Sequence, residues 1–406
     1  MPVVIRRFVV LLTRSGVGGS AWWSVVARLP VYLMTLAIVL VVREHGGSYA
    51  WAGLVSALYT VGVAVVGPAI ARWADRAGRR PVLLTTGLVF PIAVAGLVWL
   101  GGPGDVTQLV FALFAGAVLP PANSCIRSVW ARLPLDLELR QTAYLWEALL
   151  TELLVITAPV VLAVLMLTGS ASRALGVVAV LGGVGAWGLA LSRAPESPRD
   201  GSSLGTRNGP LAVLWNPGFR TLTGIMAASA VPIGLISIAV PAFVEQHGTP
   251  GHTGFVYACW GIGSALGAVL LGKASSGDAA HRRFPGFLFA FAVGTGIPVL
   301  AWSEPALAVT LAVGGMPIAL VSACEMSLVS ELADQRLLIE AFTWASTATI
   351  IGDAVGQQAG GILVESAGPR GVFLVALGFA TTVALVALAC RGRLAPAVRG
   401  PEPAQT

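Results

Sequence analysis

The sequence contains little charge. Of its 406 residues only 11% are charged, while 56% are hydrophobic and 49 are glycine. An average soluble domain has about 25% charged residues and about 7% glycine. This composition therefore excludes a water-soluble fold and predicts an all-α membrane protein.

Cysteine is scarce, and the motifs of several enzyme classes are missing. The four cysteines fall inside predicted membrane spans without a C-x-x-C pair: Cys125, Cys259, Cys324 and Cys390. The four histidines are spaced unlike a metal site. H-E-x-x-H, the phosphate-binding G-x-x-x-x-G-K-[ST] and the Gly-x-Gly-Asp pattern of intramembrane aspartyl proteases are all absent. We therefore expect no bound metal or cofactor, no enzymatic activity and no transport driven by ATP.

Apolar runs of about 20 residues, long enough to cross a hydrocarbon core of ~30 Å as helices, recur along the chain. They predict twelve membrane spans, at 20–42, 50–72, 81–101, 107–130, 142–167, 173–192, 219–243, 251–273, 284–302, 305–329, 340–364 and 370–390.

The positions of the basic residues predict which side of the membrane each loop occupies. With both termini inside, all but four of the 25 Lys and Arg lie at the inner face; the exceptions are Arg28, Arg43, Arg173 and Arg370. Cytoplasmic loops carry such an excess, so we expect both termini in the cytoplasm. The net charge of +6 then reflects topology and contact with anionic lipid, not binding to nucleic acid.

The second six predicted spans repeat the first six at a spacing near 200 residues. Pro30 and His45 correspond to Pro232 and His247, Gly53 corresponds to Gly254, and Gly116 and Trp146 correspond to Gly314 and Trp344. The predicted architecture is thus two pseudo-symmetric six-helix bundles, 1–192 and 219–406, joined by a polar cytoplasmic linker at 193–218. Parallel repeats of this kind are related by an axis along the membrane normal, with a binding site expected at mid-depth between them.

The loop between the second and third spans reads Ala71-Arg-Trp-Ala-Asp75-Arg76-Ala-Gly78-Arg79-Arg80. Together with the twelve-span layout, it resembles the major facilitator superfamily, whose G-x-x-x-D-R-x-G-R-R signature it matches except at Ala71. The resemblance implies a bacterial cytoplasmic-membrane transporter that works by alternating access, and we expect a monomer. It also implies that Asp75 holds the inner side shut against the start of span eleven, in a charge network with Arg76, Arg79 and Arg80. The alternative is that these arginines only anchor the topology.

Two pairs of opposite charges occupy equivalent places in the two halves. Arg127 and Glu325 lie at the inner ends of spans four and ten, and Arg43 and Glu245 lie at the outer ends of spans one and seven. We predict that they are a cytoplasmic and an extracellular gate that close alternately. The alternative is that each charge only solvates the membrane interface.

Few ionisable residues lie at membrane depth, where they are costly and mark functional candidates. Arg28 is expected to pair with Glu147 or Glu152, which leaves one acid without a fixed cation. Because burial favours the protonated form of a carboxyl and a nearby cation favours the charged form, the unpaired acid is the proton candidate. Glu152 is favoured for its depth, and Asp353 is the corresponding polar position in the second half. Each acid could instead join helices structurally.

Four further residues are placed to line a central cavity: Tyr32, Asn123, Tyr257 and Trp260.

The predicted function is secondary transport of a small organic compound across the inner membrane, as proton-coupled efflux. Similar antiporters have an Arg on span four and a Gly-Pro pair on span five, whereas this chain has Ala112 and Ala158-Pro159. Proton-coupled uptake of a small metabolite therefore stays open as an alternative, as does a sensor that has lost transport.

Overall fold

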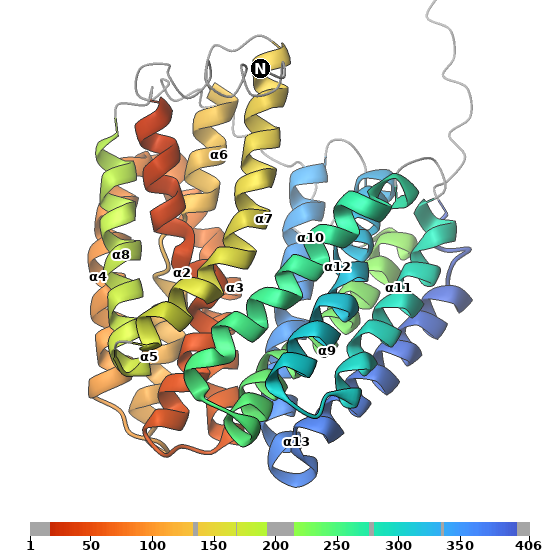
Figure 1. The fold of residues 1–406 in the computed structure, drawn as a ribbon. Helices are drawn as coiled ribbons and strands as arrows, with labels where there is room; N and C mark the ends of the chain where they lie inside the picture. Colours follow the sequence, from red (N-terminus) through yellow and green to blue (C-terminus); the bar gives the residue numbers. More distant parts are fainter. Residues whose placement is uncertain are drawn as a thin grey trace, which may run out of the picture.

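The computed structural model describes residues 17–132, 137–167, 169–192, 215–275, 280–333 and 337–395. These residues form helices and the loops between them (Figure 1). In the first half the helices are α2 (Val17–Glu44), α3 (Tyr49–Ala77), α4 (Arg79–Trp99), α5 (Val106–Ala117), α6 (Ala122–Arg132), α7 (Leu137–Leu167) and α8 (Ala171–Leu191). In the second half they are α9 (Pro217–His247), α10 (Thr253–Ser275), α11 (Ala280–Gly296), α12 (Glu304–Leu332) and α13 (Leu338–Ala389), with short 3-10 turns η2 (Pro250–His252) and η3 (Ile297–Leu300).

Helix is the expected state for these segments, because a chain in lipid must satisfy its backbone hydrogen bonds internally. Several helices begin with a polar side chain that caps the first turn. The Ser48 hydroxyl accepts a hydrogen bond from the Trp51 amide at the start of α3, and Asn216 accepts from Gly218 and Phe219 at the start of α9. Helix α9, the first helix of the second half, begins at Pro217.

Eleven helices among the described residues are long and apolar enough to cross a membrane, and they account for the twelve predicted spans. The last of them, α13, has 52 residues and contains Gly368 in a non-helical conformation, with φ 67° and ψ 175°. Its length of ~78 Å, at about 1.5 Å per residue, is more than twice the hydrocarbon thickness. Gly368 and Pro369 therefore mark the turn between the eleventh and twelfth spans.

The predicted span at 107–130 is present, since Val106–Ile126 is long and apolar enough to cross a membrane. Its helix is interrupted, because α5 ends at Ala117 and α6 begins at Ala122. Pro120 and Pro121 lie in the interruption and explain it, because each proline lacks a backbone N–H and disfavours helix in the residue before it.

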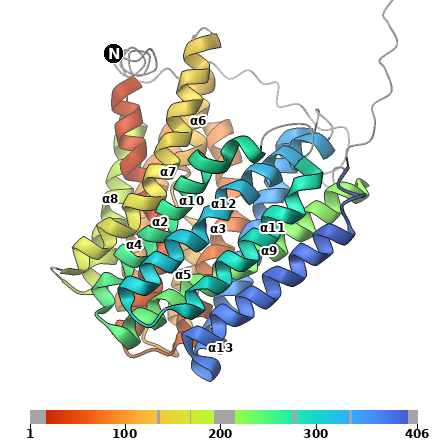
Figure 2. The same cartoon turned by 45° about the vertical axis from the view of Figure 1, so that its right-hand side comes forward.

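The helices form two groups, α2–α8 and α9–α13, which meet at one end and diverge toward the other (Figures 1 and 2). The diverging end, at the top of Figure 1, is where α8 ends and α9 begins; we call it the linker end. The opposite end, where α2 leads into α3 and α9 into α10, is called the closed end. The domain boundaries at 192 and 219 stay a prediction, since 193–214 lie outside the described residues.

Repeated glycines permit the close contact at the closed end. Gly53 on α3 lies against α13, where an added Cβ would be 2.5 Å from the Gln357 carbonyl oxygen. Its counterpart Gly254 on α10 lies even closer to the Pro159 carbonyl oxygen of α7. The two groups of helices thus touch through backbone at two places that the sequence repeat relates to each other.

Candidate transport site

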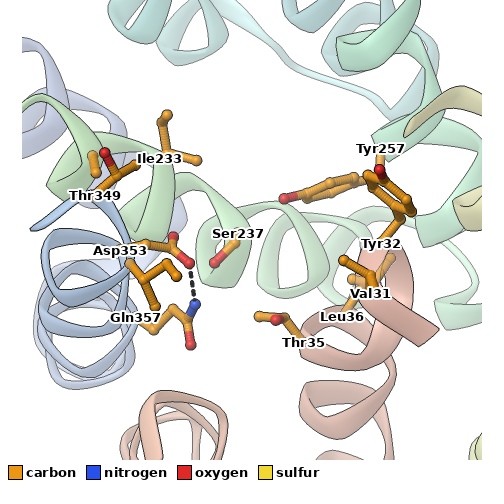
Figure 3. A pocket seen from close by; sticks show the side chains of 12 residues that line it. Val31, Tyr32, Thr35, Leu36, Ile233, Ser237, Tyr257, Thr349, Asp353 and Gln357 are labelled. Carbon is orange, nitrogen blue, oxygen red and sulfur yellow. Dashed lines mark hydrogen bonds between the residues drawn. The ribbon is translucent and has the colours of Figure 1, made fainter. Parts of the chain in front are cut away.

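A cavity of about 290 Å³ lies between the two helix groups. Its walls come from α2 of the first group and from α9, α10 and α13 of the second. The polar side chains that line it are Tyr32, Thr35, Ser237, Tyr257, Thr349, Asp353 and Gln357 (Figure 3). A cavity with polar groups at this position is where duplicated transporters bind their substrates.

Asp353 is the acidic residue in the cavity wall, and its described partner is neutral. The Gln357 amide nitrogen donates a hydrogen bond of 2.7 Å to Asp353 Oδ2, one helical turn along α13. Gln357 is fully buried, and its amide oxygen accepts a longer bond of 3.4 Å from the Thr60 hydroxyl of α3. These two hydrogen bonds connect the Asp353 carboxyl to the first group of helices.

Two tyrosines lie on the opposite side of the cavity from Asp353 and Gln357 (Figure 3). Tyr32 comes from α2 and Tyr257 from α10, and both were expected there from the sequence. Trp260 was also expected in the wall; it is not part of this wall but packs edge-on against Tyr257, with ring centroids 5.4 Å apart. Asn123, on α6, does not line this cavity either.

Arg28 is paired with one of the two acids expected for it. Its guanidinium lies 2.6 Å from Glu147 Oε1 and donates a 3.1 Å hydrogen bond to the Thr151 hydroxyl. Arg28 is fully buried and Glu147 almost so. Glu152 has an exposed side chain and does not line this cavity. The arrangement therefore favours Asp353 over Glu152 as the acid inside the cavity, and the proton site remains a prediction.

A polar cluster links the two helix groups at the closed end. Arg43 contacts Glu245 through two hydrogen bonds, of 3.1 Å from Nε to Oε2 and 2.7 Å from Nη2 to Oε1. The Tyr49 hydroxyl also donates to Glu245, and the Arg43 guanidinium carbon lies 4.3 Å from the centre of the Tyr49 ring. Beside them, Glu365 of α13 accepts a 3.0 Å bond from the Ala50 amide at the start of α3.

The signature loop forms a tight turn whose arginines have different environments. Gly78 joins α3 to α4 with φ 89° and ψ 159°, a conformation that glycine alone adopts readily. Arg79 is buried and donates a 3.0 Å hydrogen bond to the Ser192 carbonyl at the end of α8. Arg76 and Arg80 are exposed, and the Asp75 side chain lies outside the described part of the structure. Arg79 thus has a local structural contact, while the gate role of Asp75 stays a prediction.

Glu325, the acidic member of the predicted cytoplasmic gate, is buried within the second helix group. Its carboxylate accepts a 3.0 Å hydrogen bond from the Ser229 hydroxyl of α9. The Arg127 side chain is not among those described, so their pairing stays a prediction.

Thr35, Ser237 and Thr349 in the cavity wall and Thr60 behind it were not found from the sequence. Thr349 had a signal that was missed: at the repeat spacing it corresponds to Thr151, the partner of Arg28. Serine and threonine in apolar helices usually bond to the preceding turn, as Ser237 does to the Gly234 carbonyl, so their presence alone does not indicate a cavity.

Comparison with known proteins agrees with the fold. The model of the Major Facilitator Superfamily matches residues 21–335 and, in a second match, residues 222–406. The chain belongs to this superfamily of transporters, and it is a multi-pass membrane protein.

Individual relatives are distant. A drug efflux pump, JefA of Mycobacterium tuberculosis, is 28% identical over 162 residues, which are 39% of this chain and 32% of the pump. A variant of the nucleoside transporter NupG has the same fold, with a TM-score of 0.76 at 12% identity over 91% of this chain and 98% of that one. A bacterial homologue of the human lysosomal transporter Spinster gives 0.69 at 15% identity, over 95% of this chain and 98% of that one.

Proposed function

We propose that the protein is a secondary transporter that moves a small organic compound through the cavity by alternating access, in exchange for protons bound at Asp353. The observation that carries the proposal is the position of Asp353, a carboxyl in a cavity wall between two helix groups, hydrogen-bonded to a neutral glutamine. Such a carboxyl can gain and lose a proton without breaking an ion pair among the described residues.

The closed end is assigned to the outside of a bacterial cytoplasmic membrane, and both termini to the cytoplasm. Four basic residues of the signature loop, Arg72 to Arg80, lie at the linker end, and cytoplasmic loops carry the excess of basic residues. The Arg43–Glu245 contact and the Gly53 and Gly254 crossings then hold the outer side shut. On this proposal, the conformation described above is the inward-facing one.

Export is the favoured direction. It is supported by the partial match to a drug efflux pump and by the predominantly apolar helices around the cavity, which suit a compound that dissolves in the bilayer. Uptake of a small metabolite is the second candidate, because Ala112 and Ala158 replace residues found in similar antiporters.

The test is proton movement in liposomes that contain the purified protein and a pH-sensitive dye. Addition of a transported compound, found by screening antibiotics, amines, sugars and amino acids, is expected to release protons in the direction opposite to the compound. Movement in the same direction would establish uptake by symport, and no proton movement with any transported compound would contradict the coupling.

Two matched variants identify the coupling residue. Asp353→Asn keeps the size of the side chain and removes its ability to carry a proton, so proton movement is expected to stop. Glu152→Gln makes the same chemical change outside the cavity and is expected to couple normally. The opposite result would transfer the proton site to Glu152.

A further inference from the structure

We propose that the cavity selects small organic monocations, with the cationic group against Asp353 and the apolar body beside Tyr32 and Tyr257. The proposal rests on the proposed function, because it takes this cavity as the transport site. It adds the charge and the chemical class of the compound.

The first argument is the charge of the cavity wall. Asp353 is its acidic side chain, and no Lys, Arg or His is among the described residues that line it. Arg28, one turn before Tyr32 on α2, is fully buried and ion-paired with Glu147. A carboxylate away from water is costly without a compensating charge. A cationic ligand supplies this charge, whereas an anionic ligand adds to the repulsion.

The second argument is the orientation of the carboxylate. Gln357 holds Oδ2 by the 2.7 Å hydrogen bond, while Oδ1 accepts no hydrogen bond from the described part of the chain. Gln357 is itself fully buried and contacts Thr60, so it is held in place. Asp353 thus offers one oriented oxygen to a ligand, and a charge-assisted contact there is stronger than a neutral one.

The third argument is the opposite wall. Figure 3 places the rings of Tyr32 and Tyr257 across the cavity from Asp353. Aromatic rings give the apolar or aromatic body of a ligand a large surface to pack against. Val31, Leu36 and Ile233 supply apolar surface nearby, and a volume of about 290 Å³ is at the lower limit of the ~300–1,000 Å³ found for ligand pockets. The ligand is therefore small, with one charge and an apolar or aromatic body.

A single carboxylate makes the cation and the proton competitors. The other titratable side chains that line the cavity are Tyr32 from α2 and Tyr257 from α10, while α9 contributes Ser237 and the nearby α3 contributes Thr60. None of these carries charge near neutral pH. Protonation of Asp353 releases the cation, and binding of the cation releases the proton.

The experiment measures binding by calorimetry to the full-length protein in lipid nanodiscs. The probes are benzyltrimethylammonium, benzyl alcohol and benzoate, which share a benzyl-sized body and differ in charge. The ammonium compound is expected to bind at least about tenfold more tightly than the other two, in line with the ~1.5–3 kcal/mol of a contact to a charged group. Its charge is permanent, so a loss of affinity at lower pH reports titration of the protein.

Asp353→Asn is expected to lose about tenfold in affinity for the ammonium compound, together with the pH dependence. The matched control is Asp105→Asn at the start of α5, outside the cavity. Asp105 accepts hydrogen bonds from Thr107, which keep the pKa of its carboxyl below the usual value, and asparagine is an equally good N-cap. This control is expected to bind as the wild type does.

The proposal is overturned if benzyl alcohol or benzoate binds the wild type as tightly as the ammonium compound, or if Asp353→Asn retains both affinity and pH dependence. The comparison of three probes on the wild type needs no variant, so it tests the cation preference even if Asp353→Asn fails to fold. Transport of neutral compounds without ammonium binding would reject the cation preference and leave the proposed function standing. Ammonium binding without any transport would reject the proposed function, while the assignment of a cation-binding site at Asp353 would stand.

Discussion

Arg43 and Glu245, which occupy equivalent positions in the two halves of the chain, meet through two hydrogen bonds of 3.1 and 2.7 Å at the closed end. Both side chains are partly exposed, by 28% and 36%. Pairs with this exposure contribute about 0–1 kcal/mol. Such a pair adds little to folding stability but is sufficient to shift two conformations that differ by a few kcal/mol.

Arg43→Glu is therefore expected to open the closed end without unfolding the protein, because it replaces an attraction by a repulsion. The measurement is labelling of a Thr35→Cys cavity residue by a membrane-impermeant thiol reagent added outside cells, with the native cysteines replaced by alanine. Labelling should rise several-fold. The double variant Arg43→Glu with Glu245→Arg restores opposite charges and should reverse part of this increase. If it labels as strongly as Arg43→Glu alone, the Arg43–Glu245 contact does not hold the closed end shut.

Gly53→Leu is expected to prevent closure of the same end and to abolish transport. A side chain at this position meets the Gln357 backbone of α13, which cannot move aside as a flexible side chain does. The matched control is Gly176→Leu on α8, where an added Cβ meets nothing within 4 Å. Transport by proteoliposomes that contain each variant tests the prediction, and normal transport by Gly53→Leu would show that the two helices need not touch.

Gly78→Ala is expected to lower the stability of the folded protein. The backbone at Gly78, with φ 89° and ψ 159°, is a conformation that costs a residue with a side chain about 1–3 kcal/mol. The apparent Tm in detergent should fall. Gly176→Ala, in α8, where an added Cβ meets nothing within 4 Å, should leave Tm unchanged or raise it, because alanine favours helix over glycine. Equal Tm values for both variants would contradict the assignment of strain to this turn.

Glu147→Gln is expected to lower the free energy of unfolding by about 3–5 kcal/mol, since it leaves the buried Arg28 without its counter-ion. The measurement is again the apparent Tm. A double variant, Arg28→Met with Glu147→Leu, removes both charges and should recover most of the loss, since burying a charge pair is itself costly. A Glu147→Gln protein as stable as the wild type, but with altered transport, would indicate a direct role in coupling.

The sequence repeat predicted contacts that single motifs did not. Arg43 and Glu245 were expected to face each other because opposite charges occupied matching positions, and the structure has them in contact. Gly53 and Gly254 were recognised only as equivalent positions of the repeat, and the structure adds that each lies at a close helix crossing. The Arg43–Glu245 prediction followed from the near two-fold relation of the halves, which brings corresponding residues to the same end of the membrane.

The cavity wall was harder to predict, because apolar residues cover both the inner and the lipid-facing sides of these helices. In a soluble protein the polar face of a helix identifies its orientation, but in lipid this contrast disappears. Trp260 illustrates the problem: it lies one turn after Tyr257 on α10, yet it packs behind the tyrosine instead of lining the cavity. Likewise, the sequence indicates the depth of Glu152 along α7, but not whether its side chain faces the cavity.

Arg28 and Glu147 form a buried pair with no net charge. The net charge of the cavity wall therefore depends on the Asp353 carboxyl. A carrier of this kind returns across the bilayer with either one monovalent cation or one proton, and the two loaded forms have the same net charge. If Asp353 carries the proton as proposed, the exchange is electroneutral: a pH gradient drives it, and the membrane voltage does not. A divalent compound would break this equivalence and make its own export sensitive to voltage.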